Sequence, residues 1–117
     1  MQDYENALTV YRRALELEPD NAIVRLIRLE NGIEVSRTSP IKRYSTIKKD
    51  VKWFLDDGNI ASAVPVLQAE AYLYCGHYMI DAGDLDYALE LFEESVAADP
   101  KSEFAKAANK MLDKYTE

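Results

Sequence analysis

Few residues in this sequence could carry out chemistry, and they lie close together. The chain of 117 residues holds one Cys and one His, in the run Cys75-Gly76-His77. Side chains two residues apart on a helix point to opposite sides, so Cys75 and His77 are not expected to share a ligand. We expect Cys75 to be a buried structural residue. His77 and Asp81 are four residues apart and can pair on one helix face, but no nucleophile accompanies them.

Three aspartates, Asp81, Asp84 and Asp86, surround a predicted turn between helices. They lack the spacing and the closing glutamate of a calcium loop, so we interpret them as helix-capping and dipole-stabilising residues. The sequence contains no phosphate loop, nucleophile elbow or paired-cysteine motif. We therefore predict that the chain is not an enzyme and has no catalytic residue, no metal ligand and no cofactor.

Charge is divided sharply along the chain, whose formal net charge is −7. Residues 36–53 contain six basic residues and Asp50 as their one acid, whereas residues 54–100 contain ten acids and no Lys or Arg. The two segments either face each other or form separate patches for different partners. An acidic chain disfavours nucleic acid as a partner. The basic patch candidates are Lys42, Arg43, Lys48, Lys49 and Lys52.

Apolar residues recur at helical spacing along the chain, which predicts an all-α fold of about six antiparallel helices. Asp20 or Asn21 can cap the second of them, and Pro65 is tolerable only in the first turn of the fourth. The predicted helices cover about residues 3–17, 22–35, 40–56, 62–81, 85–98 and 102–115.

Prolines and glycines mark the ends of these predicted helices. Thr38-Ser39 followed by Pro40 has the form of a helix start, with a hydroxyl cap before a proline in the first turn. Gly58 suits the left-handed residue at a helix C-terminus, and Gly83 lies in the next turn.

Two segments, residues 1–19 and 69–102, share one pattern. In each, an alanine precedes a proline by 12 residues, an aromatic residue follows that alanine by four, and a small residue comes three positions later. This spacing resembles the tetratricopeptide repeat family, whose period is about 34 residues. The residues that the resemblance assigns to repeat packing are Ala7, Tyr11, Ala14, Pro19, Tyr72, Gly76, Ala88, Phe92 and Pro100.

The resemblance implies a right-handed superhelix of helix pairs with a C-terminal capping helix. Residues 1–117 would form a single domain of this type. Its expected parts are a half repeat at 1–19, a degenerate repeat with a long basic helix at 20–58, a repeat at 62–100 and a capping helix at 101–117.

The resemblance also implies a function, namely a non-enzymatic protein–protein interaction module or assembly scaffold that binds a peptide or protein in a concave groove. The groove residues it implies are apolar and acidic, which favours a basic or apolar peptide over an acidic C-terminal carboxylate. The alternative is a surface binder of anionic lipid, nucleic acid or acidic protein through helix 40–56. The groove candidates are Ile23, Leu26, Glu30, Glu34, Glu70, Leu73, His77 and Asp81.

The half repeat at residues 1–19 lacks its first helix, so part of the apolar stripe that includes Tyr4, Leu8 and Tyr11 would be exposed. Either a longer repeat array accounts for this face, or a second copy covers it in a homodimer through helix 3–17. No apolar run reaches the roughly 18 residues that span a bilayer, and the N-terminus does not have the form of a signal peptide. A cytoplasmic location is therefore expected.

Overall fold

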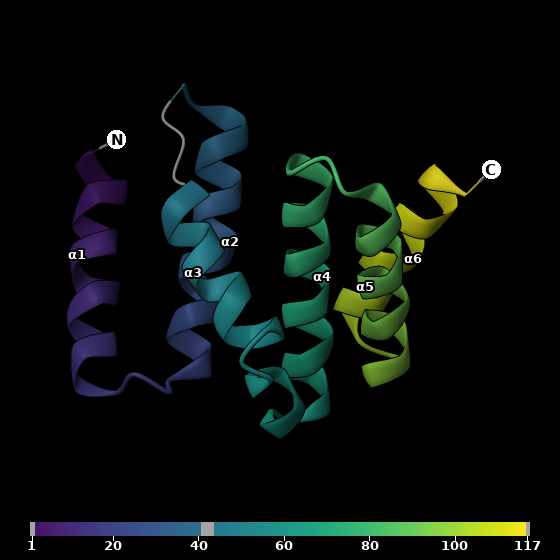
Figure 1. The fold of residues 1–117 in the computed structure, drawn as a ribbon, viewed down its shortest axis with the longest axis horizontal. Helices are drawn as coiled ribbons and strands as arrows, with labels where there is room; N and C mark the ends of the chain where they lie inside the picture. The colour runs from purple at the N-terminus through teal and green to yellow at the C-terminus, as the bar shows by residue number, and fades with distance from the viewer. Residues whose placement is uncertain (1, 41–43, 117) are drawn as a thin grey trace. The chain divides into compact units, whose positions relative to one another are not determined.

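The structure, a computed structural model, describes the backbone of residues 2–40 and 44–116 and the side chains of these residues from Glu5 onward. This part of the chain is mostly helical and contains no strand, so the predicted all-α class is confirmed (Figure 1). The helices are α1 (Gln2–Leu17), α2 (Ala22–Thr38), α3 (Tyr44–Leu55), the short 3-10 helix η1 (Asn59–Ser62), α4 (Pro65–Asp81), α5 (Leu85–Ala98) and α6 (Glu103–Tyr115).

The chain packs as two compact units, an N-terminal unit of residues 1–50 and a C-terminal unit of residues 51–117. The boundary between them falls within α3. The single domain predicted over residues 1–117, with its division into repeats, stays a prediction.

In the N-terminal unit, α1 and α2 form an antiparallel helical hairpin (Figure 1). Pro19 lies in the turn after α1, and the Asn21 side chain starts α2 by accepting a hydrogen bond from the Val24 N–H at 3.1 Å. Leu8 of α1 and Leu29 of α2 are buried. The apolar stripes of the two helices thus supply the core of this unit.

The end of α2 differs from the prediction. Thr38, expected to precede the third helix, is the last residue of α2, and its hydroxyl donates to the Glu34 carbonyl at 2.8 Å. A threonine at a helix end can bond to the carbonyl four residues earlier, and this bond keeps Thr38 in the helix. Ser39 is the C-cap. Pro40, where the predicted third helix starts, is not helical, residues 41–43 lie outside the described residues, and α3 is described from Tyr44 onward.

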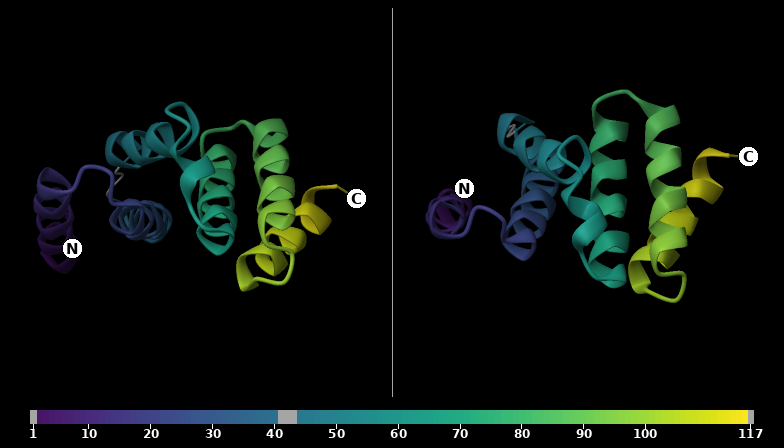
Figure 2. Two further views of the ribbon diagram at one scale, coloured as in Figure 1. Left: turned by 90° about the horizontal axis from the view of Figure 1, so that it is seen from below. Right: turned by 60° about the horizontal axis from the view of Figure 1, so that its bottom comes forward.

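In the C-terminal unit, α4 and α5 lie side by side and antiparallel, and α6 packs against both (Figure 2). Its core contains Leu73 of α4, Phe92 of α5 and Ala108 of α6, with partly buried Phe104 and Met111 packed around them. Each of the three helices therefore contributes one apolar face to a shared core.

Gly76 explains how closely α4 and α5 approach. A Cβ atom on this residue would lie 2.6 Å from Cε1 of Phe92, whose side chain is fully buried. A second contact links the same helices, because the Ser95 hydroxyl donates to the Ala69 carbonyl at 2.7 Å in the buried interior. The small residue and the hydroxyl thus fix the spacing of this helix pair.

The turns of this unit lie at the glycines and helix-capping residues of the sequence. Gly58 has φ +74° and Gly83 has φ +89°, the left-handed conformation that glycine adopts without strain. The Asp84 side chain accepts from the Tyr87 N–H at 3.1 Å and starts α5, which spans the predicted residues 85–98. Ser102 caps α6 in the same way through the Ala105 N–H.

The start of α4 corrects another prediction. Ser62, expected to begin this helix, is instead the last residue of η1, and α4 begins at Pro65 with Val64 as its N-cap. Proline has no N–H to donate, so it fits the first position of a helix, and this fixes the start.

Candidate functional site

The residues singled out for possible chemistry are Cys75, His77 and Asp81, which all lie on α4. Cys75 is a fully buried free thiol. The half-buried His77 ring meets the Phe92 ring in an edge-to-face contact, at a centroid distance of 5.5 Å, and Asp81 is exposed at the end of α4. Among residues 2–40 and 44–116, no group of three or more His, Cys, Asp and Glu side chains could hold a metal ion.

Two of the three aspartates at the α4–α5 turn have the role assigned to them from the sequence. Asp84 caps α5, and Asp86 lies in the first turn of that helix, where a negative charge is favoured by the helix dipole.

The eight groove candidates differ in how accessible they are. In the N-terminal unit, Ile23 and Glu34 are exposed, Glu30 is half-buried and Leu26 is buried. In the C-terminal unit Asp81 is exposed, Glu70 and His77 are half-buried, and Leu73 belongs to the core. Leu26 and Leu73 therefore support the fold and do not offer a surface to a ligand. A groove shared by α2 and α4 stays a prediction.

The repeat-packing candidates are also spread over several environments. Gly76, Ala88 and Phe92 are buried between α4, α5 and α6. The half-buried positions are Ala7, Tyr11, Ala14 and Tyr72, and the prolines at positions 19 and 100 are exposed in turns. Tyr11 accepts a hydrogen bond from Asn31 Nδ2 at 2.7 Å, which joins α1 to α2.

The basic patch is only partly described. Lys48 and Lys49 are exposed on α3, and Lys52 donates to Asp57 at 2.8 Å in an exposed ion pair that raises the pKa of its ammonium. Lys42 and Arg43 lie outside the described residues.

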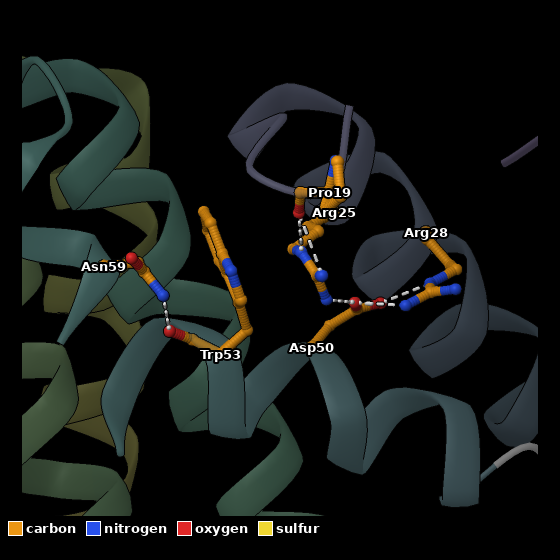
Figure 3. Close-up of polar contacts among 6 residues, drawn as sticks. All are labelled: Pro19, Arg25, Arg28, Asp50, Trp53 and Asn59. Carbon is orange, nitrogen blue, oxygen red and sulfur yellow. Dashed lines mark hydrogen bonds and ion pairs between the residues drawn. The ribbon is translucent and has the colours of Figure 1, made fainter. Parts of the chain in front are cut away.

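The one acid of this basic stretch, Asp50, is fully buried and is held by two arginines of α2 (Figure 3). Arg28 donates twice to its carboxylate, at 2.7 Å and 2.6 Å, and Arg25 donates to it at 3.2 Å while also bonding to the Pro19 carbonyl. This cluster ties α2 to α3 within the N-terminal unit. It also removes the one acid of residues 36–53 from the surface.

A second polar contact orders the turn that follows α3. Asn59 Nδ2 donates to the Trp53 carbonyl at 2.8 Å (Figure 3). The bond closes the turn around Gly58 and leads the chain into η1, where Ile60 is buried. Residue 60 is thereby brought beside α4 and α5.

These elements line an open pocket of about 350 Å³ in the C-terminal unit. Its buried members, Ile60 and Leu91, form an apolar inner wall together with half-buried Leu55. Two half-buried tyrosines from neighbouring helices, Tyr72 of α4 and Tyr87 of α5, also line the pocket. The remaining lining residues are three exposed glutamates of α5, namely Glu90, Glu93 and Glu94.

The pocket carries negative charge that no ion pair among the described residues offsets. Residues 54–100 contain no Lys or Arg, and in the described structure the three glutamates form no ion pair. This environment changes the pKa of the two tyrosine hydroxyls. Burial raises the pKa of Tyr72 and Tyr87, and the carboxylates of Glu94 beside the first and of Asp56 and Glu90 beside the second raise it further. Both hydroxyls are therefore neutral at physiological pH.

Sequence reasoning assigned only Tyr72 of these lining residues, and it assigned it to packing. A signal was present on α5, because residues 87, 90, 91 and 94 recur at helical spacing and so share one face. Leu55 and Ile60 could not be assigned from spacing, since a turn and η1 bring them to the pocket.

Tyr72 lies on the side of α4 opposite Glu70 and Asp81, because these positions differ by about half a helical turn.

Comparison with protein families, with curated proteins and with solved structures found no match to this chain. Within the described residues, no helix is both long enough and apolar enough to cross a membrane.

Proposed function

We propose that this chain is a non-enzymatic protein-interaction module built from tetratricopeptide-like helix pairs, and that it binds a basic segment of a partner protein. Two features of the α4–α5 pair support the repeat assignment. The close approach of Phe92 to Gly76 is the packing that the repeat pattern requires, and Pro100 follows Ala88 at the spacing of the repeat. A superhelix with a concave groove is part of the proposal.

The observation that carries the binding proposal is the acidic pocket between η1, α4 and α5. A surface with three unpaired carboxylates attracts cations, and it suppresses binding of acidic partners through like-charge repulsion. Because residues 54–100 contain no Lys or Arg, the charged side chains of this segment that are ionised at neutral pH are all negative. A partner segment rich in Lys and Arg is therefore complementary to this surface, in keeping with the basic peptide expected from the acidic groove candidates.

The test is a titration of the full chain with three unstructured peptides of equal length, one basic, one neutral and one acidic. We expect saturable binding of the basic peptide alone, weakening as salt rises from low to moderate concentration because the charges are exposed. A chain that binds the acidic or neutral peptide as well as the basic one would contradict the proposal.

Two double variants locate the binding surface. Glu90→Lys/Glu94→Lys reverses charge at the pocket, and Glu70→Lys/Asp81→Lys reverses it on the opposite side of α4, at the predicted groove. Asp113→Lys/Glu16→Lys alters exposed acids elsewhere and makes the same change in net charge. The proposal requires that one of the first two variants loses the basic peptide while this control keeps it.

The basic stretch supports a second candidate function, electrostatic binding of an anionic partner through helix 40–56. The supporting observation is the burial of Asp50, which leaves the exposed Lys48 and Lys49 without a neighbouring surface acid in their own stretch. Vesicles containing anionic lipid provide the test. Binding that Lys48→Glu/Lys49→Glu abolishes would support this candidate, and equal binding to neutral vesicles would contradict it.

A further inference from the structure

We propose that the pocket between η1, α4 and α5 is a recognition site for an arginine side chain of the partner, an inference that rests on the proposed function and names its ligand. The lining supplies three kinds of surface in one place, namely aliphatic, aromatic and carboxylate. An arginine side chain has a complementary part for each of these surfaces. Its stem is apolar, its guanidinium group has a planar face, and the edge of that group carries a fork of N–H donors.

The inner wall accepts the stem. Ile60 and Leu91 are 5% and 3% exposed, and half-buried Leu55 extends the same apolar surface. A long aliphatic stem that lies against this wall removes apolar area from water while its charged end stays near the opening. A volume of about 350 Å³ is at the small end for ligand pockets, which suits one or two side chains better than a folded element.

The tyrosines accept the planar face of a guanidinium. Tyr72 and Tyr87 come from two different helices, so their positions are fixed by the α4–α5 packing around Gly76 and Phe92. Both rings are neutral at physiological pH, and neutral phenol rings attract cations through their π faces. Guanidinium stacks on such rings more readily than an ammonium group, because it is planar and more weakly hydrated.

The glutamates at the rim accept the N–H donors. Glu90 and Glu94 are four residues apart on one face of α5, and Glu93 lies beside them. A carboxylate can take two parallel hydrogen bonds from one guanidinium, whereas a lysine ammonium meets it as a point charge. The pocket is therefore expected to distinguish arginine from lysine, which a purely electrostatic surface does not do.

The experiment compares three flexible Gly/Ser peptides that carry three arginines, three lysines or three citrullines at the same positions. Each is titrated into the full isotope-labelled chain and followed by NMR and calorimetry. We expect the arginine peptide to bind about two- to fivefold more tightly than the lysine peptide, the equivalent of one exposed cation–π contact. Citrulline keeps the planar group without the charge, so its peptide should not bind. Shifted resonances should include those of Tyr72 and Tyr87.

Pocket variants assign the preference to individual groups. Glu90→Gln/Glu94→Gln alters exposed side chains only, and it should weaken the arginine peptide. Tyr87→Leu should remove the preference for arginine over lysine, and Tyr87→Phe, which keeps the π face, should retain it. Asp113→Asn/Glu16→Gln removes the same number of charges from exposed acids elsewhere, so it is the matched control and should leave binding unchanged. Far-UV circular dichroism establishes that each variant is folded before binding is compared.

The possible failures are distinct. Equal affinity for the arginine and lysine peptides, unaffected by the pocket variants, would overturn the arginine site and leave the proposed binding of basic segments standing. Failure of both cationic peptides to bind would overturn the proposed function and the arginine site together.

Discussion

Asp50 shows how burial changes what a charged residue does in this chain. Its carboxylate is fully buried and meets Arg28 in two short hydrogen bonds and Arg25 in a third. Removing one member of a buried ion pair leaves the other charges without compensation in the interior. We therefore expect Asp50→Asn to lower the free energy of unfolding by about 3 kcal/mol.

Urea denaturation followed by circular dichroism measures this change. Asp57→Asn is the control, because it removes the exposed acid that pairs with Lys52, and exposed pairs contribute little to stability. If Asp50→Asn has no larger effect than this control, the Arg25–Asp50–Arg28 cluster does not stabilise the N-terminal unit in the way its geometry indicates.

The pocket tyrosines give the chain a defined pH dependence. The pKa of Tyr72 and Tyr87 is raised above the ordinary 10.0, chiefly by burial and further by negative charge nearby. Above pH 10 the unfolded chain releases these protons before the folded chain does, so the folded state loses stability as pH rises. Below pH 10 both states hold the protons, and this contribution is fully present.

The measurement is the free energy of unfolding at several pH values from neutral to above the tyrosine range. Tyr72→Phe/Tyr87→Phe should flatten the alkaline decline, since phenylalanine has no proton to lose. A double variant that declines as steeply as the original chain would show that other groups cause the alkaline loss.

At the scale of helices, Gly76 sets the approach of α4 to α5. Replacing it with alanine places a methyl group 2.6 Å from a ring carbon of Phe92, which is enclosed on all sides. Overpacking of this kind costs about 1–3 kcal/mol, more than the gain of roughly 1 kcal/mol that alanine brings to an ordinary helix position. We expect Gly76→Ala to lower the free energy of unfolding of the chain.

A double-mutant cycle with Phe92→Leu tests the cause. The smaller, more flexible leucine relieves the contact, so Gly76→Ala should be less harmful in that background. Equal costs in both backgrounds would mean that the ring of Phe92 is not what the added methyl group meets.

The helices were largely predictable from sequence, because local signals mark their ends. Asp84 and the proline after α5 give that helix the predicted bounds, and Asn21 starts α2 at the predicted residue. The misplaced boundaries lie where local signals compete. Thr38 can cap a following helix or bond back into its own, and Ser62 precedes a proline that sets the start of α4.

The candidate site was less predictable, because tertiary packing brings its parts together. The spacing of Tyr87, Glu90 and Glu94 on α5 is visible in the sequence, but their meeting with Leu55 and Ile60 depends on the turn closed by Asn59. The pairing of Asp50 with arginines more than 20 residues earlier has no local signature either. Counting charges along the chain therefore gives the net charge of a segment, but it does not show which of those charges lie on the surface.

At the scale of the whole molecule, the exposed apolar residues of α1 bear on the oligomeric state. Val10 is 64% exposed and Leu17 is 84% exposed, and these positions are seven residues apart on one helix face. They lie on a different side of α1 from Leu8 and Tyr11, which belong to the stripe through which a homodimer was predicted. Two side chains bury far less than the roughly 1,200 Å² that a stable interface requires. The net charge of −7 adds repulsion between copies.

We therefore expect the chain to sediment as a monomer at micromolar concentration in physiological salt. Sedimentation velocity over a range of concentrations measures this, with Val10→Ser/Leu17→Ser as the matched variant. A dimer that this variant dissociates would establish the α1 face as a homodimer interface, contrary to the small apolar area. A dimer that is unaffected by the variant but dissociates on adding salt would instead indicate pairing of opposite charges, because screening weakens exposed ion pairs and leaves apolar contacts intact.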